Sequence, residues 1–454
     1  MEPKSSIHFA SALLPAGWAD DVRIVAESGR IALVEAGAAA RPEDARGAIG
    51  LPGLGNLHSH AFQRAMAGLT GHRGTGDDSF WTWRELMYRF VGRLTPDDVE
   101  AIAAMAYVEM VEAGYTRVGE FHYLHHGPDG HPYDNPAEMG ARIAAAAEAA
   151  GIGLTLLPVF YAQGGFGGVA AGAGQARFLS SADAYARLVE ASRRAVSPLA
   201  DARVGIAPHS LRAVPPEALA AVLPLAGEGP VHIHIAEQVR EVLDCLAWSG
   251  QRPVEWLLDH AQVDERWCLV HATHMTADET ARLARSGAVA GLCPVTEADL
   301  GDGLFPAVAY RAGGGAWGVG TDSNVAIDLA DELRLLEYGQ RLQHHTRNVL
   351  ADEGRSVGRS LFDAALAGGA RALGMPAGLE QGAPADWVTL DQDHPALAGR
   401  AGDAILDSFI FAAGREAIAE VWRSGRRLVT DGRHRERDRT VARFRAVLHK
   451  LAAE

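Results

Sequence analysis

Lysine is almost missing from this sequence of 454 residues, which has it only at Lys4 and Lys450. A catalytic lysine is therefore excluded unless one end of the chain reaches the site. Cysteine is scarce too, and its three residues, Cys245, Cys268 and Cys293, are odd in number and widely spaced. This pattern argues against a disulfide framework and contains no CxxC metal motif.

Long apolar runs are also absent, since no window approaches 18 uninterrupted apolar residues. The first residues show no basic segment followed by a long apolar core, so we expect a cytoplasmic protein. The net charge of −15 at pH 7 disfavours nucleic acid and membrane surfaces as partners, because both need clustered cations. Local arginines could still bind a small anionic substrate.

Eight short apolar runs alternate with helical patterns after the first 50 residues. They lie at residues 50–57, 116–121, 153–160, 202–208, 229–235, 267–272, 288–293 and 316–321. Stretches between them, such as PDDVEAIAAMAYVEMVEAG, have acidic starts and apolar residues at i, i+3 and i+4, which predicts helices. This α/β alternation favours a closed (β/α)8 barrel over residues 50–379. A doubly wound sheet would need a glycine-rich phosphate loop after its first strand, where this chain has histidines.

The two ends of the chain have a different pattern. Residues 1–49 and 380–432 contain short strand-like pieces, each too short to bury a core alone. We therefore expect a small composite β-sandwich domain built from both termini. Residues 433–454, which begin with the mixed-charge run RHRERDR, are expected to form a C-terminal helix with a solvated face.

Metal-capable side chains follow several of the predicted strands. His58 and His60 share one face of the first strand, because side chains alternate along an extended chain. His234, His271 and Asp322 lie at the ends of the fifth, sixth and eighth strands. The carboxyl ends of barrel strands meet on one face, where chemistry collects. The pattern therefore favours a metal site over chance neighbours.

Other histidines are expected to have no ligand role. His232 precedes His234 by two residues, and we expect it to be a buried core or supporting histidine. The cluster FHYLHHGPDGH, which contains His122, His125, His126 and His131, is expected to be a solvated loop.

Several longer stretches resemble the amidohydrolase superfamily, and within it the formimidoylglutamate deiminases. They include NLHSHAFQRAMAGL, APHSLRAV, HIHIAEQ, CPVTEADLGDGLFPA and GTDSNVAIDLADELRLLEYGQRL. The resemblance implies that one divalent ion, Zn²⁺ or Fe²⁺, is held by His58, His60, His234 and Asp322. Many members of the superfamily bind a second metal through a carboxylated lysine after strand four. The segment GIAPHSLRAV has no lysine, which favours a single ion.

The resemblance also implies roles in a reaction. Glu237 would move protons to the departing nitrogen, and His271 and Asp322 would orient or deprotonate the water. The implied reaction is hydrolysis of N-formimino-L-glutamate, a dicarboxylate of histidine degradation, to N-formyl-L-glutamate and ammonia. The residues implied to bind this substrate are Gln63, Arg84, Tyr123, His209 and Arg212.

Two other functions stay open at this point. One is a ring deaminase of the same superfamily, acting on guanine, cytosine or an adenosine derivative. The other is a non-catalytic barrel that serves as a scaffold, which should have lost ligands that this chain retains. Relatives are commonly dimers, which implies a homodimer. Asn324 departs from many superfamily deaminases, which have a histidine at this place.

Overall fold

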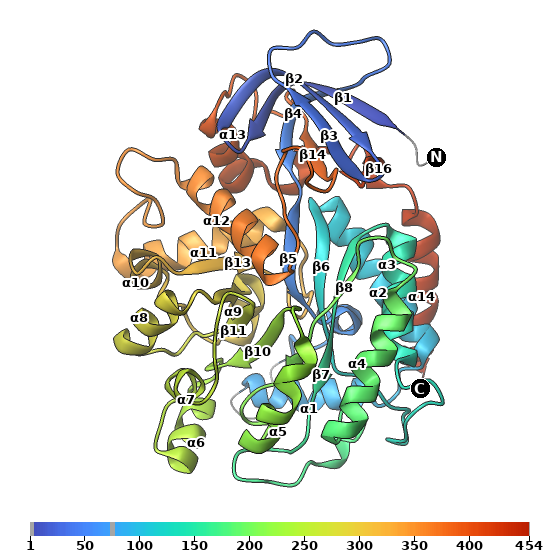
Figure 1. The fold of residues 1–454 in the computed structure, drawn as a ribbon, viewed down its shortest axis with the longest axis vertical. Helices are drawn as coiled ribbons and strands as arrows, with labels where there is room; N and C mark the ends of the chain where they lie inside the picture. Colours follow the sequence, from blue (N-terminus) through green and yellow to red (C-terminus); the bar gives the residue numbers. More distant parts are fainter. Residues whose placement is uncertain (1–3, 73–77, 454) are drawn as a thin grey trace.

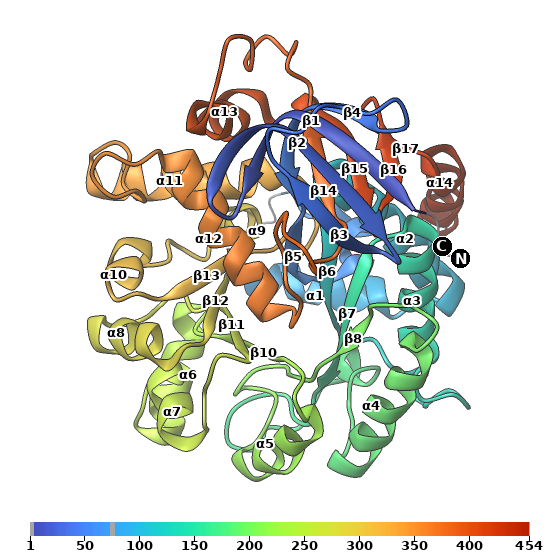
Figure 2. The same cartoon turned by 45° about the horizontal axis from the view of Figure 1, so that its top comes forward.

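The computed structural model describes residues 4–72 and 78–453, so residues 1–3 and 454 of the expected terminal segments lie outside the described residues. A barrel of parallel strands surrounded by helices forms the larger part of the molecule (Figure 1). A sheet built from both ends of the chain packs against it (Figure 2).

Short parallel strands form the wall of the barrel. They are β5 (Leu54–Ser59), β6 (Tyr115–His122), β7 (Gly153–Phe160), β8 (Arg203–Val204), β9 (Ala207–Pro208), β10 (Val231–Ile235), β11 (Trp267–His271), β12 (Val289–Leu292) and β13 (Ala316–Val319). One group of hydrogen-bonded strands runs from β5 to β9 and the other from β10 to β13. Parallel bridges between Ile206 and Val231 and between Ser59 and Asp322 join the groups at both seams. Since β8 and β9 are two pieces of the predicted fourth strand, the (β/α)8 barrel is confirmed.

Helices pack mainly around the outside of the barrel. They are α1 (Phe80–Val91), α2 (Pro96–Glu112), α3 (Glu138–Ala150), α4 (Ala182–Val196), α5 (Pro216–Val222), α6 (Val239–Ser249), α7 (Pro253–His260), α8 (Ala277–Ser286), α9 (Pro294–Leu300), α10 (Ala307–Ala312), α11 (Leu329–His344), α12 (Val357–Ala372), α13 (Asp403–Ser408) and α14 (Arg437–Ala453). Their ends follow local signals: Thr95 and Asp98 form a capping box on α2, and Gly151 ends α3 with a left-handed φ of 71°. Among the described residues, no helix is long and apolar enough to span a lipid bilayer.

The two ends of the chain meet in one mixed sheet. Its strands are β1 (Ser5–Leu14), β2 (Gly17–Glu27), β3 (Arg30–Glu35), β4 (Ala45–Pro52), β14 (Trp387–Leu390), β15 (Ile418–Arg423), β16 (Arg426–Thr430) and β17 (Arg433–His434). The order is β17-β16-β15-β14-β4-β1-β2-β3, so β4 joins the two halves. A small core lies against this sheet, in which the rings of Trp387 and Trp422 stack at 5.5 Å.

This sheet differs in detail from the expected β-sandwich. Because β4 pairs with β1 on one edge and with β14 on the other, the described strands form one continuous sheet. Pro52 pairs with Trp387, so the terminal sheet extends past the expected boundary at residue 49 and the first barrel strand starts at Leu54. His434 is likewise a buried strand residue, and the C-terminal helix begins at Arg437.

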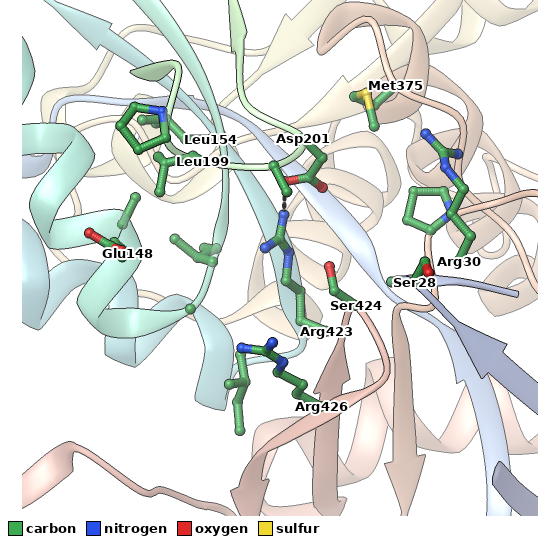
Figure 3. A pocket seen from close by; sticks show the side chains of 18 of the residues that line it. Ser28, Arg30, Glu148, Leu154, Leu199, Asp201, Met375, Arg423, Ser424 and Arg426 are labelled. Atoms are coloured by element: carbon green, nitrogen blue, oxygen red, sulfur yellow. Dashed lines mark hydrogen bonds and ion pairs between the residues drawn. The ribbon is translucent and has the colours of Figure 1, made fainter. Parts of the chain in front are cut away.

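A half-buried carboxylate attaches the terminal sheet to the barrel. Figure 3 shows the cavity between them, with the guanidinium of Arg423 directed at Asp201. Asp201 also pairs with Arg117 of β6, so one carboxylate bridges a barrel arginine and a sheet arginine. The hydrogen bonds from both arginines make up for the cost of burying these charges.

A second buried ion pair stabilises the terminal sheet and gives a pH prediction. Burial alone would raise the pKa of Asp44, but hydrogen bonds, first of all from Arg23, outweigh it and lower the pKa to about 2. A lowered carboxyl pKa means that the stabilisation is fully present above pH ~4 and is lost as the pH falls towards 2. We expect Asp44→Asn to lower the free energy of unfolding by roughly 1–2 kcal/mol at pH 7. Urea unfolding at pH 7 and pH 3 measures this, and a deficit of the same size at both pH values would contradict it.

Candidate functional site

Three imidazoles and one carboxylate meet at the carboxyl ends of the barrel strands. His58 lies in β5, His60 directly follows it, His234 lies in β10, and Asp322 follows β13. The three Nε2 atoms are 3.2 Å (His58–His60), 3.3 Å (His60–His234) and 3.1 Å (His58–His234) apart. Oδ1 of Asp322 lies 3.5 Å from Nε2 of His58 and 3.2 Å from Nε2 of His60. All four side chains are buried, so the cluster is shielded from bulk water.

Two of these imidazole rings have their Nδ1 atoms protonated, which leaves their Nε2 lone pairs facing each other and favours a cation between them. Nδ1 of His60 lies 2.8 Å from the carbonyl oxygen of Phe121, and Nδ1 of His234 lies 3.1 Å from that of His209. A carbonyl only accepts, so each Nδ1 carries the proton and each Nε2 presents a lone pair. Lone pairs that face each other at 3.3 Å repel unless a positive ion lies between them.

The cluster fits one tetrahedral ion. Ligand nitrogens about 2.0–2.1 Å from Zn²⁺ are about 3.4 Å apart in a tetrahedron, close to the 3.1–3.3 Å between these nitrogens. Three imidazoles and a carboxylate suit a divalent transition metal. Neither lysine reaches the site, because Lys4 pairs with Glu27 and Lys450 with Asp98.

A neighbouring group of possible ligands does not add a second metal site. His271, Cys293 and Asp322 have ligand atoms within 4.8 Å of one another. Asp322 belongs to this group and to the ligand cluster, so the two groups overlap in space. Burial raises the pKa of the Cys293 thiol well above its usual range. Nδ1 of His271 is already engaged, 3.2 Å from Oε1 of Glu297. The residues therefore fit a single ion.

Glu237 and His271 face the cluster from one side. Nε2 of His271 lies 3.9 Å from Oε1 of Glu237 and 3.8 Å from Oδ2 of Asp322. The hydrogen bond from Nδ1 of His271 to Glu297 sets the orientation of the ring. Burial raises the pKa of Glu237 to about 7, although His271 and Arg212 act to lower it. A carboxyl group with this pKa can take up and return a proton at neutral pH.

The cavity in front of the cluster is lined by every residue expected to bind substrate. These are Gln63, Arg84, Tyr123, His209 and Arg212. Nε2 of Gln63 donates to the hydroxyl of Tyr123 at 2.8 Å, so these two side chains hold each other in place. Aromatic side chains complete the wall: Phe80, Trp83, Tyr88, Tyr161 and Phe178.

The two arginines have different surroundings. Arg212 is buried and lies 3.7 Å from Oε2 of Glu237 and 3.5 Å from Oε2 of Glu241. Arg84 stacks on Trp81 at 4.5 Å and its buried Nε has no hydrogen-bond partner. Within the described part of the chain Arg84 has no carboxylate partner, so its charge is available to a carboxylate of a ligand.

Two carboxylates that the sequence patterns did not predict hold the backbone beside the site. Oε1 of Glu241 accepts from the backbone nitrogen of Ala236 at 3.1 Å, and Glu297 accepts from that of Cys293 at 3.0 Å. Both lie in the first turn of a helix that follows a barrel strand. An acidic residue at this place, four residues after Glu237 or Cys293, is the signal that could have found them.

Family comparisons agree with this geometry. Residues 49–428 match the family model described as "Amidohydrolase family". The chain belongs to the amidohydrolase family. Residues 4–48 of this amidohydrolase match a second model, "Formimidoylglutamate deiminase HutF, N-terminal domain". The resemblance seen in the sequence is therefore confirmed at both levels.

Individual relatives extend over nearly the whole amidohydrolase. It is 52% identical to the formimidoylglutamate deiminase of Pseudomonas aeruginosa over 98% of this chain and 99% of the relative. A 5-methylthioadenosine/S-adenosylhomocysteine deaminase of Natronomonas pharaonis is 32% identical over 83% of this chain and 81% of its own. A crystal structure of an amidohydrolase from Brucella melitensis has 54% identity and a TM-score of 0.96, covering 99% and 100% of the two chains. A zinc-bound adenosine deaminase from Xanthomonas campestris, at 22% identity and a TM-score of 0.81, shares the fold.

Asn324 forms hydrogen bonds beside the cluster, where the first and last strands of the amidohydrolase barrel meet. Its side-chain nitrogen lies 3.1 Å from Oγ of Ser59 and 3.2 Å from the carbonyl oxygen of His60. The same nitrogen lies 3.0 Å from the carbonyl oxygen of Asp322. Asn324 is fully buried and has a left-handed φ of 56°, which asparagine tolerates better than most residues. Its side chain therefore positions two ligand-bearing loops and does not face the substrate cavity.

We expect Asn324→Ala to weaken metal binding by about 10–100-fold, because residues that orient metal ligands contribute this much. Competition with a chromophoric chelator measures the affinity directly, without relying on turnover. Asn348→Ala is the matched control, because Asn348 is exposed and has a similar φ of 55°. Equal metal affinity in the two variants would contradict a positioning role for Asn324.

The histidines that were expected to have no ligand role lie outside the ligand cluster. His232 is fully buried and lies 2.8 Å from the carbonyl oxygen of Ala372, outside the ligand cluster. The expectation of a solvated loop is wrong for His122 and His125, since both are buried. His126 is half-buried, and the expectation is confirmed for His131, which is exposed and lies outside any helix or strand. His122 ends β6, and Nε2 of His125 lies 2.8 Å from the carbonyl oxygen of Val159 in β7.

Proposed function

We propose that this amidohydrolase hydrolyses the formimino C–N bond of N-formimino-L-glutamate, giving N-formyl-L-glutamate and ammonia in histidine degradation. The observation that carries the proposal is that His60, His234 and Asp322 of the ligand cluster line one cavity together with Glu237 and two arginines. The 52% identity to the Pseudomonas aeruginosa enzyme supports it. The substrate has two carboxylates, and guanidinium groups bind carboxylates with paired hydrogen bonds.

In this proposal His58, His60, His234 and Asp322 hold the metal, which is Zn²⁺, with Fe²⁺ as the alternative. Such an ion supplies Lewis acidity, which makes water a competent nucleophile near neutral pH. The residues that surround the cluster then bind and orient the reactants and move the protons.

Glu237 carries the protons of the reaction. Its carboxylate takes one proton from the attacking water, and the oxygen of that water forms a bond to the formimino carbon. Glu237 then delivers this proton to the terminal nitrogen. It next takes the remaining hydroxyl proton of the tetrahedral intermediate and passes it to the same nitrogen, so that the C–N bond breaks as the C=O bond forms, ammonia leaves and the formyl group remains. His271, held by Glu297, orients the water together with Asp322.

Arg84 and Arg212 bind the carboxylates of the substrate in this proposal. Tyr123, Gln63 and His209 line the same cavity and would donate further hydrogen bonds. Arg212 also lies near Glu237, so substrate binding and proton transfer share one wall.

Ammonia release from N-formimino-L-glutamate by the zinc-loaded protein tests the proposal, with guanine, cytosine and S-adenosylhomocysteine as competing substrates. We expect turnover of formiminoglutamate alone, and a loss of about 10–100-fold in kcat/KM in Arg84→Met. Arg89→Met, an exposed position on the same helix, is the control and should match the parent protein. Turnover of a ring substrate with none of formiminoglutamate would keep the metal chemistry and overturn the substrate.

The proposal includes a cytoplasmic location and a homodimer. Cys245, Cys268 and Cys293 are free thiols, which suits a reducing compartment. The homodimer rests on the behaviour of relatives and stays a prediction, which sedimentation velocity of the purified protein tests.

A further inference from the structure

A second hollow, which we call the vestibule, opens in front of the metal cavity. It is lined by residues of α1 and α6 and by the loop 164–169, among them Trp81, Glu85, Phe166, Arg240, Asp244 and Trp248. Arg84 and Arg212 line both hollows. Because the same two arginines border both spaces, the vestibule adjoins the metal cavity.

Three guanidinium groups surround one indole ring in the vestibule. The Cζ atoms of Arg84, Arg240 and Arg212 lie 4.5, 4.8 and 5.8 Å from the ring centre of Trp81. Stacking on an aromatic face holds a guanidinium in place and leaves its N–H groups free to bind an anion. The ring of Trp81 therefore holds three guanidinium groups close together in the vestibule.

The charge of the vestibule is opposite to that of the whole protein. Of the described residues that line it, three are arginines and two, Glu85 and Asp244, are carboxylates. The chain as a whole has a net charge of −15, so this mouth is a local exception. A positive cleft in an acidic protein concentrates anions at its entrance.

Arg240 is the outermost of these arginines and is available to a ligand. Its side chain is 65% exposed, and its contact with Asp244 is 3.6 Å long between two exposed side chains. An exposed ion pair of this kind contributes little, so an incoming carboxylate can replace it. Arg84 and Arg212 are more deeply placed, which orders the three arginines from outside to inside.

The opposite wall of the vestibule is held in place by aromatic stacking. Phe166 packs on Trp248 of α6 with ring centres 5.4 Å apart and an interplanar angle of 24°. The loop is closed by a hydrogen bond from the backbone nitrogen of Gly164 to the carbonyl oxygen of Val169. Phe166, Trp248 and Trp81 thus give the vestibule an aromatic lining beside its arginines.

We propose that Arg240 and Trp81 form an outer carboxylate subsite, which captures small dicarboxylates before Arg84 and Arg212 bind them. This inference rests on the proposed function for the identity of the physiological dicarboxylate, and it adds a step of substrate capture to that function. The subsite acts on association and leaves the chemical step to the metal cavity, because a charge at the rim changes the rate of encounter.

The test compares Arg240→Gln with Arg194→Gln in the zinc-loaded protein. Arg194 is an ideal control, because it is 67% exposed and pairs with a glutamate four residues away, on α4. At low ionic strength we expect Arg240→Gln to lower kcat/KM for formiminoglutamate about fivefold with kcat unchanged. The difference should shrink as added salt screens the charge, and Arg240→Lys should restore most of it.

Stopped-flow tryptophan fluorescence with glutarate gives a second readout that needs no turnover. We expect Arg240→Gln to slow glutarate association by a similar factor, and Arg194→Gln to leave it unchanged. Equal association rates in the two variants, or no binding of glutarate by the parent protein, would overturn the subsite. Slower association in Arg240→Gln with no turnover of formiminoglutamate by the parent would overturn the proposed function and keep the subsite.

Discussion

Glu237→Gln is expected to lower kcat for ammonia release by about 10²–10⁴-fold, because an amide cannot take up and return the proton. The change keeps the size of the side chain, and Glu237 is not among the four residues that meet in the ligand cluster. Metal content and melting temperature should therefore remain close to those of the parent protein. Steady-state ammonia release, measured beside metal analysis of the same sample, separates a lost proton carrier from a lost ion.

The pH profile sharpens this prediction. Since burial raises the pKa of Glu237 to about 7 in the free protein, the parent protein should show a pH-dependent limb of kcat/KM near neutrality, which Glu237→Gln should lack. Glu217→Gln, at an exposed position on α5, is the control for the loss of one negative charge. A Glu237→Gln protein with more than a tenth of parental kcat would exclude Glu237 as the proton carrier.

Removal of the metal is expected to abolish turnover and to destabilise the barrel. Without a cation, the Nε2 lone pairs of His60 and His234 face each other at 3.3 Å in a buried site. A ligand that binds only the folded state stabilises it by about 4 kcal/mol when its free concentration is a thousandfold above Kd. Chelation should therefore lower the melting temperature together with activity, and stoichiometric Zn²⁺ should restore both.

His234→Gln extends the same prediction to one ligand. The variant should bind much less than one ion per chain and should not regain activity when Zn²⁺ is added. His344→Gln, an exposed position at the end of α11, is the control and should bind one ion per chain. Full metal content and full activity in His234→Gln would remove His234 from the ligand set.

Periodic features of the sequence predicted most of the fold and the centre of the site. The strands that end in His58, His234 and His271 are short buried runs, and their carboxyl ends must meet in a parallel barrel. Their side chains could thus be placed together without knowledge of any distance. Arg84 and Arg212 came from the resemblance and could not be placed by periodicity, because they lie beyond the strands.

The features that sequence analysis missed depend on contacts between distant segments. Glu297 supports His271 across two neighbouring strands, and no local pattern links the two residues. The pattern around His125 is typical of a loop, but His125 is buried and contacts the carbonyl oxygen of Val159 in β7. The join between β4 and β14 likewise depends on packing, because an isolated strand pattern does not specify its partner.

The position of β4 has a consequence for folding during translation. One edge of β4 pairs with β1, but the other needs β14, and Pro52 meets Trp387. At about 5–20 residues per second, the intervening chain takes on the order of tens of seconds to emerge. During that time β4 presents an unpaired edge, which is a template for association with other nascent chains. A chain truncated before residue 387 would leave this edge of β4 unpaired. The C-terminal part of the chain, through β14, therefore protects β4 from intermolecular pairing.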